Sequence, residues 1–362
     1  MRVRPVDLID VVRKTRVFVI DDSPLVRQVL GYLIERDHGL EVIGSAADGA
    51  AAWERIVELD PDVLTLDADL PQMDGLSFLE KVMKTRPVRT LMVSEQAGRG
   101  SESTLRALEL GAVDYLARPP LDAKASLQEF ARELGAKIRS AAAARLRMPV
   151  RLPAPPPAPP PAPPVSVVEA VQGSPDRVVV MGASTGGAEA LRAVLKALPA
   201  GSPGIAVVQH MPEPFARSFA ERLDKVCNVR VREAKNGDAI VQGHVLLAPA
   251  NRHMRIRRAG QRYVVELSDG APVNGFRPAV DVLFLSCARQ AGANGVGVLM
   301  TGMGDDGARG LLALREAGGR TIVQDESSCV VFGMPREAIE RGAAEIVLPL
   351  AKIADAVMRS TV

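Results

Sequence analysis

Short apolar runs alternate with amphipathic stretches along the first 145 residues. The apolar runs predict buried strands at residues 16–20, 41–46, 62–66, 90–93 and 113–116. The stretches that follow predict helices at 23–35, 49–59, 75–85, 101–110 and 123–145. Because strands this apolar have both faces covered, five such units predict a (βα)5 domain with a parallel sheet between two layers of helices.

The same alternation returns in the second half of the chain. It predicts strands at residues 177–181, 204–209 and 295–300, and helices at 187–197, 213–225, 279–291 and 308–317. Residues 229–249 are strand-like but broken by Asn236-Gly237 and Gly243, which favours hairpins there, and 254–268 alternates like a further hairpin. We therefore expect a second α/β domain that is doubly wound and mostly parallel, with an antiparallel hairpin insert.

Residues 149–164 are almost entirely proline and alanine. Proline lacks a backbone donor and clashes with a helical turn, so this segment predicts an extended spacer of roughly 50 Å at full reach. The alternative is a docking site for a proline-binding module. The predicted organisation is an N-terminal extension (1–15), a first domain (16–145), a linker (146–175) and a second domain (176–362).

Charge and composition narrow the classes of partner. The 362 residues include 45 basic and 43 acidic ones, a balance that gives no reason to expect binding to nucleic acid or to a membrane surface. No apolar run approaches the roughly 20 residues of a spanning helix, and the N-terminus lacks the apolar core of a signal peptide. We expect a cytoplasmic monomer, in which three widely spaced cysteines are buried apolar residues.

Acidic and polar residues end successive strands of the first domain. Asp21 and Asp22 follow the first strand, Asp67 the third, Ser94 the fourth and Arg118 the fifth. Carboxylates gathered at one sheet edge repel one another unless a cation holds them, and an all-oxygen ligand set suits Mg²⁺. A carboxylate beside Mg²⁺ can accept a phosphoryl group, which a hydroxyl and a cation opposite it can then bind.

These residues, with the segment 64–75, resemble the receiver domain of bacterial response regulators. The resemblance implies that Asp67 is the phosphoacceptor, and that Asp22, Asp67 and the backbone carbonyl of Asp69 hold Mg²⁺ with Asp21 as an accessory acid. It makes Ser94 and Tyr115 the switch residues. The chain departs from the family at Arg118, where the pattern has lysine. Arginine is longer and forked but keeps the charge, so it can still bind phosphate.

In the second domain, Gly182-Ala183-Ser184-Thr185-Gly186-Gly187 lies between a valine-rich strand and a helix. This is the context of a Gly-x-Ser-x-Gly nucleophile elbow, in which the N–H of Thr185 can face a developing oxyanion. A glycine-rich turn at this place can equally cradle a phosphate or a dinucleotide. The motif alone leaves a hydrolase and a nucleotide-binding protein equally open.

Only four histidines are available as a base. His210 is favoured because it ends the strand after Ser184, while His253 and His244 are rivals that hairpin or loop positions also explain. An orienting acid is available after the strand 295–300, at Asp305 or Asp306, although either one can instead cap the next helix. The order Ser, His, Asp differs from that of α/β-hydrolases and indicates another fold.

From about residue 178 the chain resembles the chemotaxis protein-glutamate methylesterases, the CheB family, which also deamidate glutamines. The matching stretches include 182–187, 208–212, 247–254, 276–281, 301–307 and 324–335. The resemblance implies the triad Ser184, His210 and Asp306, with the N–H groups of Thr185 and Met303 binding the oxyanion and no cofactor for ester hydrolysis. It also implies modified glutamates and glutamines of chemoreceptors as substrate and a chemotaxis histidine kinase as phosphodonor.

Two other functions stay open at this point. One is a non-enzymatic response regulator, and the other is the same chemistry on a non-chemotaxis signalling protein. The family also implies that the unphosphorylated receiver covers the esterase site. Because the linker is so rich in proline, we expect this inhibition to be weak here.

Overall fold

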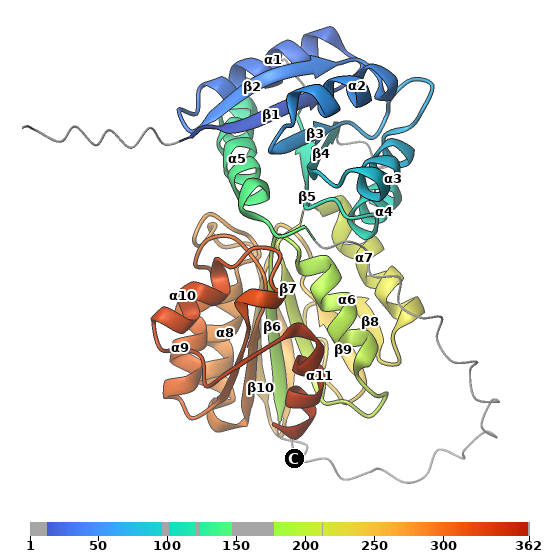
Figure 1. Cartoon of the computed structure of the whole chain (residues 1–362). Coiled ribbons are helices and arrows are strands. Elements are labelled where there is room, and N and C mark those ends of the chain that lie inside the picture. Colours follow the sequence, from blue (N-terminus) through green and yellow to red (C-terminus); the bar gives the residue numbers. More distant parts are fainter. Residues whose placement is uncertain (1–12, 96–100, 120–123, 147–176, 212, 361–362) are drawn as a thin grey trace, which may run out of the picture. The chain divides into compact units, whose positions relative to one another are not determined.

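The computed structural model describes residues 13–95, 101–119, 124–146, 177–211 and 213–360. By their contacts the described residues form two compact units. The first lies within Met1–Ala97 and Asp114–Ala143, and the second lies within Gly98–Val113 and Ala144–Val362 (Figure 1). The expectations for the proline-rich spacer and for most of the N-terminal extension lie outside the described residues. Each unit is described by itself.

The first unit is built on a five-stranded parallel sheet with the strand order β2-β1-β3-β4-β5. The strands are β1 (Thr15–Ile20), β2 (Leu40–Ala46), β3 (Val63–Leu66), β4 (Arg89–Glu95) and β5 (Asp114–Arg118). The helices are α1 (Pro24–Glu35), α2 (Gly49–Leu59), α3 (Gly75–Thr85) and α5 (Lys124–Ala143), while α4 (Ser101–Glu109) is grouped with the second unit. This is the flavodoxin-like order, in which ligands bind beyond the carboxyl ends of the strands.

Side-chain caps fix where three of these helices begin. The side chains of Ser23, Asp48 and Asp74 accept backbone N–H groups from the first turns of α1, α2 and α3. Such residues satisfy donors that have no partner within a helix. The expected starts at residues 23, 49 and 75 are therefore within one residue of the observed ones.

The second unit contains a seven-stranded parallel sheet with the order β14-β13-β12-β6-β7-β9-β8. The strands are β6 (Val178–Ala183), β7 (Gly204–Gln209), β8 (Arg230–Glu233), β9 (His244–Leu247), β12 (Gly295–Leu299), β13 (Arg320–Gln324) and β14 (Ile346–Leu348). The chain starts at the centre with β6, builds to the β8 edge, and then returns to place β12 on the other side of β6. This confirms the doubly wound, mostly parallel fold expected from the sequence.

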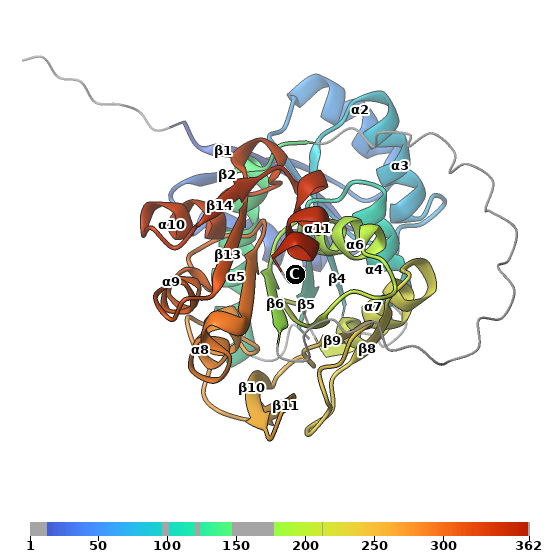
Figure 2. The same ribbon diagram turned by 90° about the horizontal axis from the view of Figure 1, so that it is seen from below.

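Helices cover both faces of this sheet (Figures 1 and 2). On one face, Val179 and Met181 of β6 pack in a cluster with α6 (Gly187–Ala197), α7 (Glu213–Val226) and α11 (Leu350–Arg359). On the other, Val178 and Val180 pack with α8 (Val280–Gln290), α9 (Ala308–Glu316) and α10 (Met334–Glu340). Successive side chains of a strand point to opposite faces of the sheet. A strand that is apolar along its whole length therefore contributes to the hydrophobic core on each face.

The antiparallel insert is the hairpin of β10 (His253–Ala259) and β11 (Arg262–Ser268), which confirms the expectation for 254–268. The hairpins expected within 229–249 are wrong, because β8 and β9 are parallel neighbours in the main sheet. The Asn236-Gly237 turn pairs elsewhere: the Asn236 side chain accepts the N–H of Leu267, and the Gly237 N–H donates to Val265. Four elements that follow the last predicted helix were not expected from the sequence: β13, α10, β14 and α11.

Candidate active site

Three neighbouring strands bring Ser184, His210 and Asp306 together. Ser184 follows β6, His210 follows β7, and Asp306 lies in the loop between β12 and α9. Both β7 and β12 pair with β6, so all three carboxyl ends lie at one edge of the sheet. The connection reverses direction between β6 and β12, and such switch points are where open α/β sheets form their sites.

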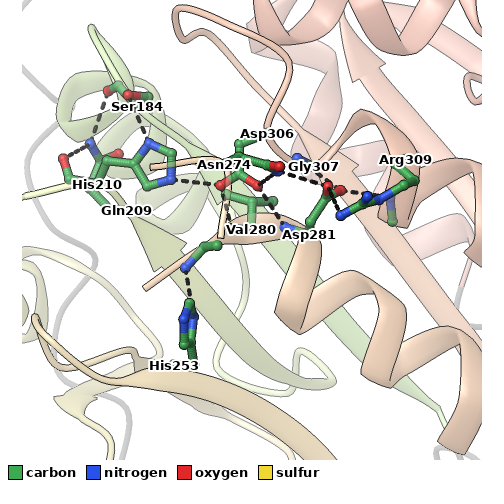
Figure 3. Close-up of polar contacts among 12 residues, drawn as sticks. Ser184, Gln209, His210, His253, Asn274, Val280, Asp281, Asp306, Gly307 and Arg309 are labelled. Atoms are coloured by element: carbon green, nitrogen blue, oxygen red, sulfur yellow. Dashed lines mark hydrogen bonds and ion pairs between the residues drawn. The ribbon is translucent and has the colours of Figure 1, made fainter. Parts of the chain in front are cut away.

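The three side chains form a hydrogen-bonded chain (Figure 3). His210 Nδ1 lies 3.1 Å from Ser184 Oγ, and His210 Nε2 lies 2.9 Å from Asp306 Oδ2. An ionised carboxylate only accepts hydrogen bonds, so the imidazole proton belongs on Nε2. The lone pair of Nδ1 then faces the serine hydroxyl, which is the arrangement that a general base requires.

Asp306 lies at the N-terminus of α8. Its Oδ2 accepts the N–H of Val280 at 2.7 Å and its Oδ1 accepts the N–H of Asp281 at 3.1 Å. Burial raises the pKa of the Asp306 carboxyl, but the hydrogen bond and charge of His210 and these two backbone donors outweigh it and leave the pKa below its usual value. This fully buried acid is therefore held ionised beside the imidazole.

The alternative residues considered from the sequence lie elsewhere. Asp305 is exposed and pairs with Arg341 at 2.9 Å. His244 contacts the carbonyl of Gln242. His253 is buried and bridges two backbone groups, accepting the N–H of Ala279 at Nδ1 and contacting the carbonyl of Ala271 through Nε2. Among the described residues, His210 is the histidine hydrogen-bonded to Ser184.

Close packing of backbone segments surrounds the serine. A Cβ on Gly302 would lie 2.8 Å from the Cβ of Ser184 and 2.2 Å from the sulfur of Met334. Gly186 has φ +75° and ends the turn at the start of α6. Thr185 is buried on this turn and Met303 is partly buried in the facing loop. Their role as oxyanion donors stays a prediction.

Sequence reasoning missed three residues of this site. The ring of Phe276 stacks on His210 with centroids 3.8 Å apart and planes 8° from parallel. Asn274 donates its side-chain amide to Asp306, and Gln209 donates to the carbonyl of Ser184. The dipeptide Asn274-Gly275 was an available signal, because Asn-Gly strongly favours a two-residue turn.

The first unit holds the expected acidic cluster. One carboxylate oxygen each from Asp21, Asp22 and Asp67 lie within 4.8 Å of one another. Burial and the neighbouring charge of Asp67 raise the pKa of Asp21 to about 6. Burial also raises the pKa of Asp67. Asp21 Oδ2 is buried and has no hydrogen-bond partner among the described residues, so the cluster fits a hard cation.

The other predicted receiver residues lie at the same sheet edge or on the neighbouring strands. The N–H of Asp69 contacts Asp67 Oδ1 at 3.4 Å. Ser94 is buried at the end of β4, and its hydroxyl lowers the pKa of Asp67, though less than burial raises it. Arg118 is buried, and its positive charge opposes the rise in the pKa of Asp21. Tyr115 is buried on β5, and its switching role stays a prediction.

The helices among the described residues are all too short or too polar to span a membrane.

Comparison with known proteins gives two family matches. Residues 179–357 match the CheB methylesterase model, and residues 17–128 match the response regulator receiver domain. The chain is 51% identical to "Protein-glutamate methylesterase/protein-glutamine glutaminase 1" of Geobacter metallireducens over 93% of each chain. It is 52% identical to "Protein-glutamate methylesterase/protein-glutamine glutaminase 2" of Pseudomonas aeruginosa, over 95% of this chain and 96% of that one.

A solved structure of a catalytic domain also matches the chain. The crystal structure of the Thermotoga maritima CheB methylesterase catalytic domain matches with a TM-score of 0.50 and 38% identity. The match covers 51% of this chain and 97% of that domain.

Proposed function

The chain belongs to the CheB methylesterase family and carries a response regulator receiver domain, and from this we propose that Ser184, His210 and Asp306 hydrolyse glutamate methyl esters on chemoreceptors. The protein is a phosphorylation-regulated methylesterase of bacterial chemotaxis that also deamidates glutamines. The observation that supports the assignment of residues is the continuous hydrogen-bonded chain from Ser184 Oγ through the imidazole to Asp306. That intact chain also argues against a non-enzymatic regulator.

In the first half of the reaction, Ser184 Oγ attacks the ester carbonyl while its proton passes to His210 Nδ1. The imidazolium that forms is stabilised by Asp306, whose carboxylate stays ionised. We assign the tetrahedral oxyanion to the backbone N–H groups of Thr185 and Met303. The C–O bond to the methoxy group then breaks, His210 returns the proton, and methanol leaves an acyl-enzyme.

In the second half, water attacks the acyl carbonyl and gives its proton to His210 Nδ1. The bond to Ser184 Oγ breaks and the serine recovers its proton, which releases the glutamate side chain. A glutamine side chain follows the same route with ammonia as the leaving group. These steps use the three side chains, two backbone N–H groups and water, and we propose that ester hydrolysis needs no cofactor.

The receiver supplies the regulatory chemistry. Asp22, Asp67 and the backbone carbonyl of Asp69 would hold Mg²⁺, with Asp21 as accessory acid, and the ion would neutralise charge on the transferring phosphoryl group. Asp67 accepts the phosphoryl group from a chemotaxis histidine kinase. We propose that Ser94, Tyr115 and Arg118 respond to it, and that Ser94 and Arg118, both buried, bind phosphate oxygens.

The cellular location of the protein and its domain boundaries are part of the same proposal. The substrate is the cytoplasmic part of a receptor, so the enzyme acts in the cytoplasm. We place the receiver at 16–145 and the catalytic domain at 176–362, joined by the proline-rich linker, in a protein that acts as a monomer.

Mass spectrometry of a methylated receptor tests the assignment. The wild-type protein should remove 14 Da per ester with release of methanol, and Ser184→Ala should lose this activity by at least about 10⁴-fold because the nucleophile is gone. His244→Ala is the matched control, since this histidine contacts a backbone carbonyl away from Ser184, and it should keep wild-type activity. Equal methanol release from wild type and Ser184→Ala would contradict the assignment of the triad.

A further inference from the structure

A two-residue turn beside the catalytic acid holds an amide between two buried carboxylates. Val273 and Phe276 exchange backbone hydrogen bonds of 3.0 and 2.9 Å, and the residues between them are Asn274 (φ +54°) and Gly275 (φ +81°). Positive φ at both central positions is the signature of a type I′ turn, for which Asn-Gly is the preferred sequence. The backbone conformation is thus encoded locally.

The Asn274 amide joins Asp306 to a second acid. Its Nδ2 lies 2.9 Å from Asp306 Oδ1 and 2.9 Å from Asp281 Oδ2 (Figure 3). An amide nitrogen carries two hydrogens, so it can donate one to each carboxylate. Asp306 then accepts hydrogen bonds from four groups, two at each oxygen: His210 and Val280 at Oδ2, and Asn274 and Asp281 at Oδ1.

Asp281 is itself fixed. Its Oδ1 accepts the N–H groups of Gly307 and Gly310 at the start of α9, and its Oδ2 pairs with Arg309 at 3.2 Å. The two helices therefore exchange caps: Asp306, just before α9, binds the N-terminus of α8, while Asp281, in the first turn of α8, binds that of α9. Asn274 is the side chain that links these two caps.

The turn is anchored on both sides. His253 bridges Ala271 and Ala279, which lie before and after it, and Phe276 stacks on His210. The turn therefore sets the position of the imidazole through Phe276 and that of its acid through Asn274. Nothing in this arrangement requires Asn274 to touch the substrate.

We propose that Asn274 is a positioning residue of the esterase, which orients Asp306 against His210 Nε2 and offsets the negative charge of the Asp281–Asp306 pair. This inference rests on the proposed triad. Without the amide, Asp281 and Asp306 each lose a hydrogen-bond donor, and the negative charge beside His210 is less well offset. The protonated form of the Asp306–His210 pair is then favoured, so the pair loses its proton at higher pH.

Two variants separate the amide from the turn. Asn274→Gly removes the side chain but tolerates positive φ, and Asn274→Asp keeps the shape and turn preference while replacing the donor with a third negative charge. The control is Asn236→Asp, the same change at another Asn-Gly turn, where the side-chain oxygen accepts the N–H of Leu267 and a carboxylate can still do so.

The readout is the rate at which a fluorophosphonate probe labels Ser184 in the full-length chain, measured between pH 5 and 9. We expect Asn274→Gly to slow labelling at pH 7 by about 10-fold, the effect of losing a hydrogen bond to a charged group. The acid limb of the profile should move to higher pH, and further for Asn274→Asp than for Asn274→Gly. Asn236→Asp should match the wild type.

A double-mutant cycle with Asp306→Ala completes the test. If Asn274 acts through Asp306, Asn274→Gly should change the residual labelling rate by less than about twofold once Asp306 is absent. The inference fails if Asn274→Gly labels like wild type, or if it slows labelling equally in both backgrounds with an unmoved acid limb. The proposed function fails separately, if Ser184→Ala or Asp306→Ala leaves ester hydrolysis at the wild-type rate.

Discussion

Two buried groups of carboxylates, each at the carboxyl edge of a parallel sheet, ionise in opposite ways. Asp21 and Asp67 in the receiver have raised pKa values, while Asp306 in the catalytic domain has a lowered one. Burial raises the pKa in each case, so burial does not distinguish them. The difference lies in the donors and the charges around each carboxylate.

Asp306 accepts hydrogen bonds from four groups that belong to the protein. Asp21 accepts the N–H of Ser23 at one oxygen, and its other oxygen has no partner among the described residues. Both carboxylate oxygens of Asp306 are therefore satisfied by the protein, whereas one oxygen of Asp21 is left without a donor among the described residues and could face the cation that we propose. The two sites therefore differ in how many carboxylate oxygens accept hydrogen bonds from the protein itself. Asp306 is held ionised by such bonds, whereas Asp21 is not.

Asp306→Asn tests this contrast most severely. The amide keeps the shape but loses the charge, and it presents an NH₂ group to a site built entirely from donors. We expect kcat for ester hydrolysis to fall by about 10⁴-fold, because the imidazole loses its preferred tautomer. Steady-state hydrolysis of a methylated receptor measures this effect. A fall of less than about tenfold would show that the ionised carboxylate of Asp306 is not needed for catalysis.

The corresponding substitution in the receiver cluster, Asp21→Asn, should increase the free energy of unfolding of the first unit. Between about pH 4 and 6 the folded receiver binds a proton at Asp21 that the unfolded chain has released, so stability declines as the pH rises through this window. Above pH 6 the folded receiver carries the whole cost of ionising the Asp21 carboxyl. The shift in its pKa from 3.8 to about 6 corresponds to about 3 kcal/mol of lost stability. Without Mg²⁺, Asp21→Asn should raise the free energy of unfolding by about this amount at pH 8 and by little at pH 3.

Trp53 in α2 is the single tryptophan of the chain, so its fluorescence during denaturation follows the first unit. Adding Mg²⁺ should stabilise the wild type more than Asp21→Asn, because the ion neutralises the charge that the substitution removes. An Asp21→Asn protein that is less stable than wild type at pH 8 without Mg²⁺ would contradict the raised pKa.

A smaller effect is expected on the degree to which the receiver inhibits ester hydrolysis. The composition of residues 149–164 predicts an extended spacer that disfavours docking of the tethered domains, so we expect residues 176–362 alone to hydrolyse ester only about threefold faster than the unphosphorylated full chain. Esterase rates at equal concentrations provide the measurement, with Asp67→Asn full-length protein as the non-phosphorylatable control. Activation of about a hundredfold or more on truncation would mean that the receiver inhibits strongly despite its tether.

The sequence was informative where local rules are strong. Apolar runs identify the strands around both sites, and the order of those strands along the chain correctly predicts that Ser184 and His210 lie at neighbouring strand ends. Ser23, Asp48 and Asp74 mark helix starts because a capping side chain acts within its own turn.

The rest depends on contacts between distant segments. Asn274 reaches an acid 32 residues away, and Phe276 stacks on the histidine that follows β7. The dipeptide Asn274-Gly275 predicts a turn but not what the turn faces. The turn at Asn236-Gly237 illustrates the same limit, since its local chemistry suggested a hairpin while its partners lie on β11.

The position of β12 also determines when the site is assembled during synthesis. Ser184 and His210 are 26 residues apart, but Asp306 comes 96 residues after His210. The ribosome therefore completes β6 and β7 well before β12, and domains fold largely as units as the chain emerges. Until β12 inserts beside β6, a nascent or prematurely terminated chain carries a serine and a histidine without the acid that orients them. The fold thus delays hydrolytic competence until the catalytic domain is nearly complete.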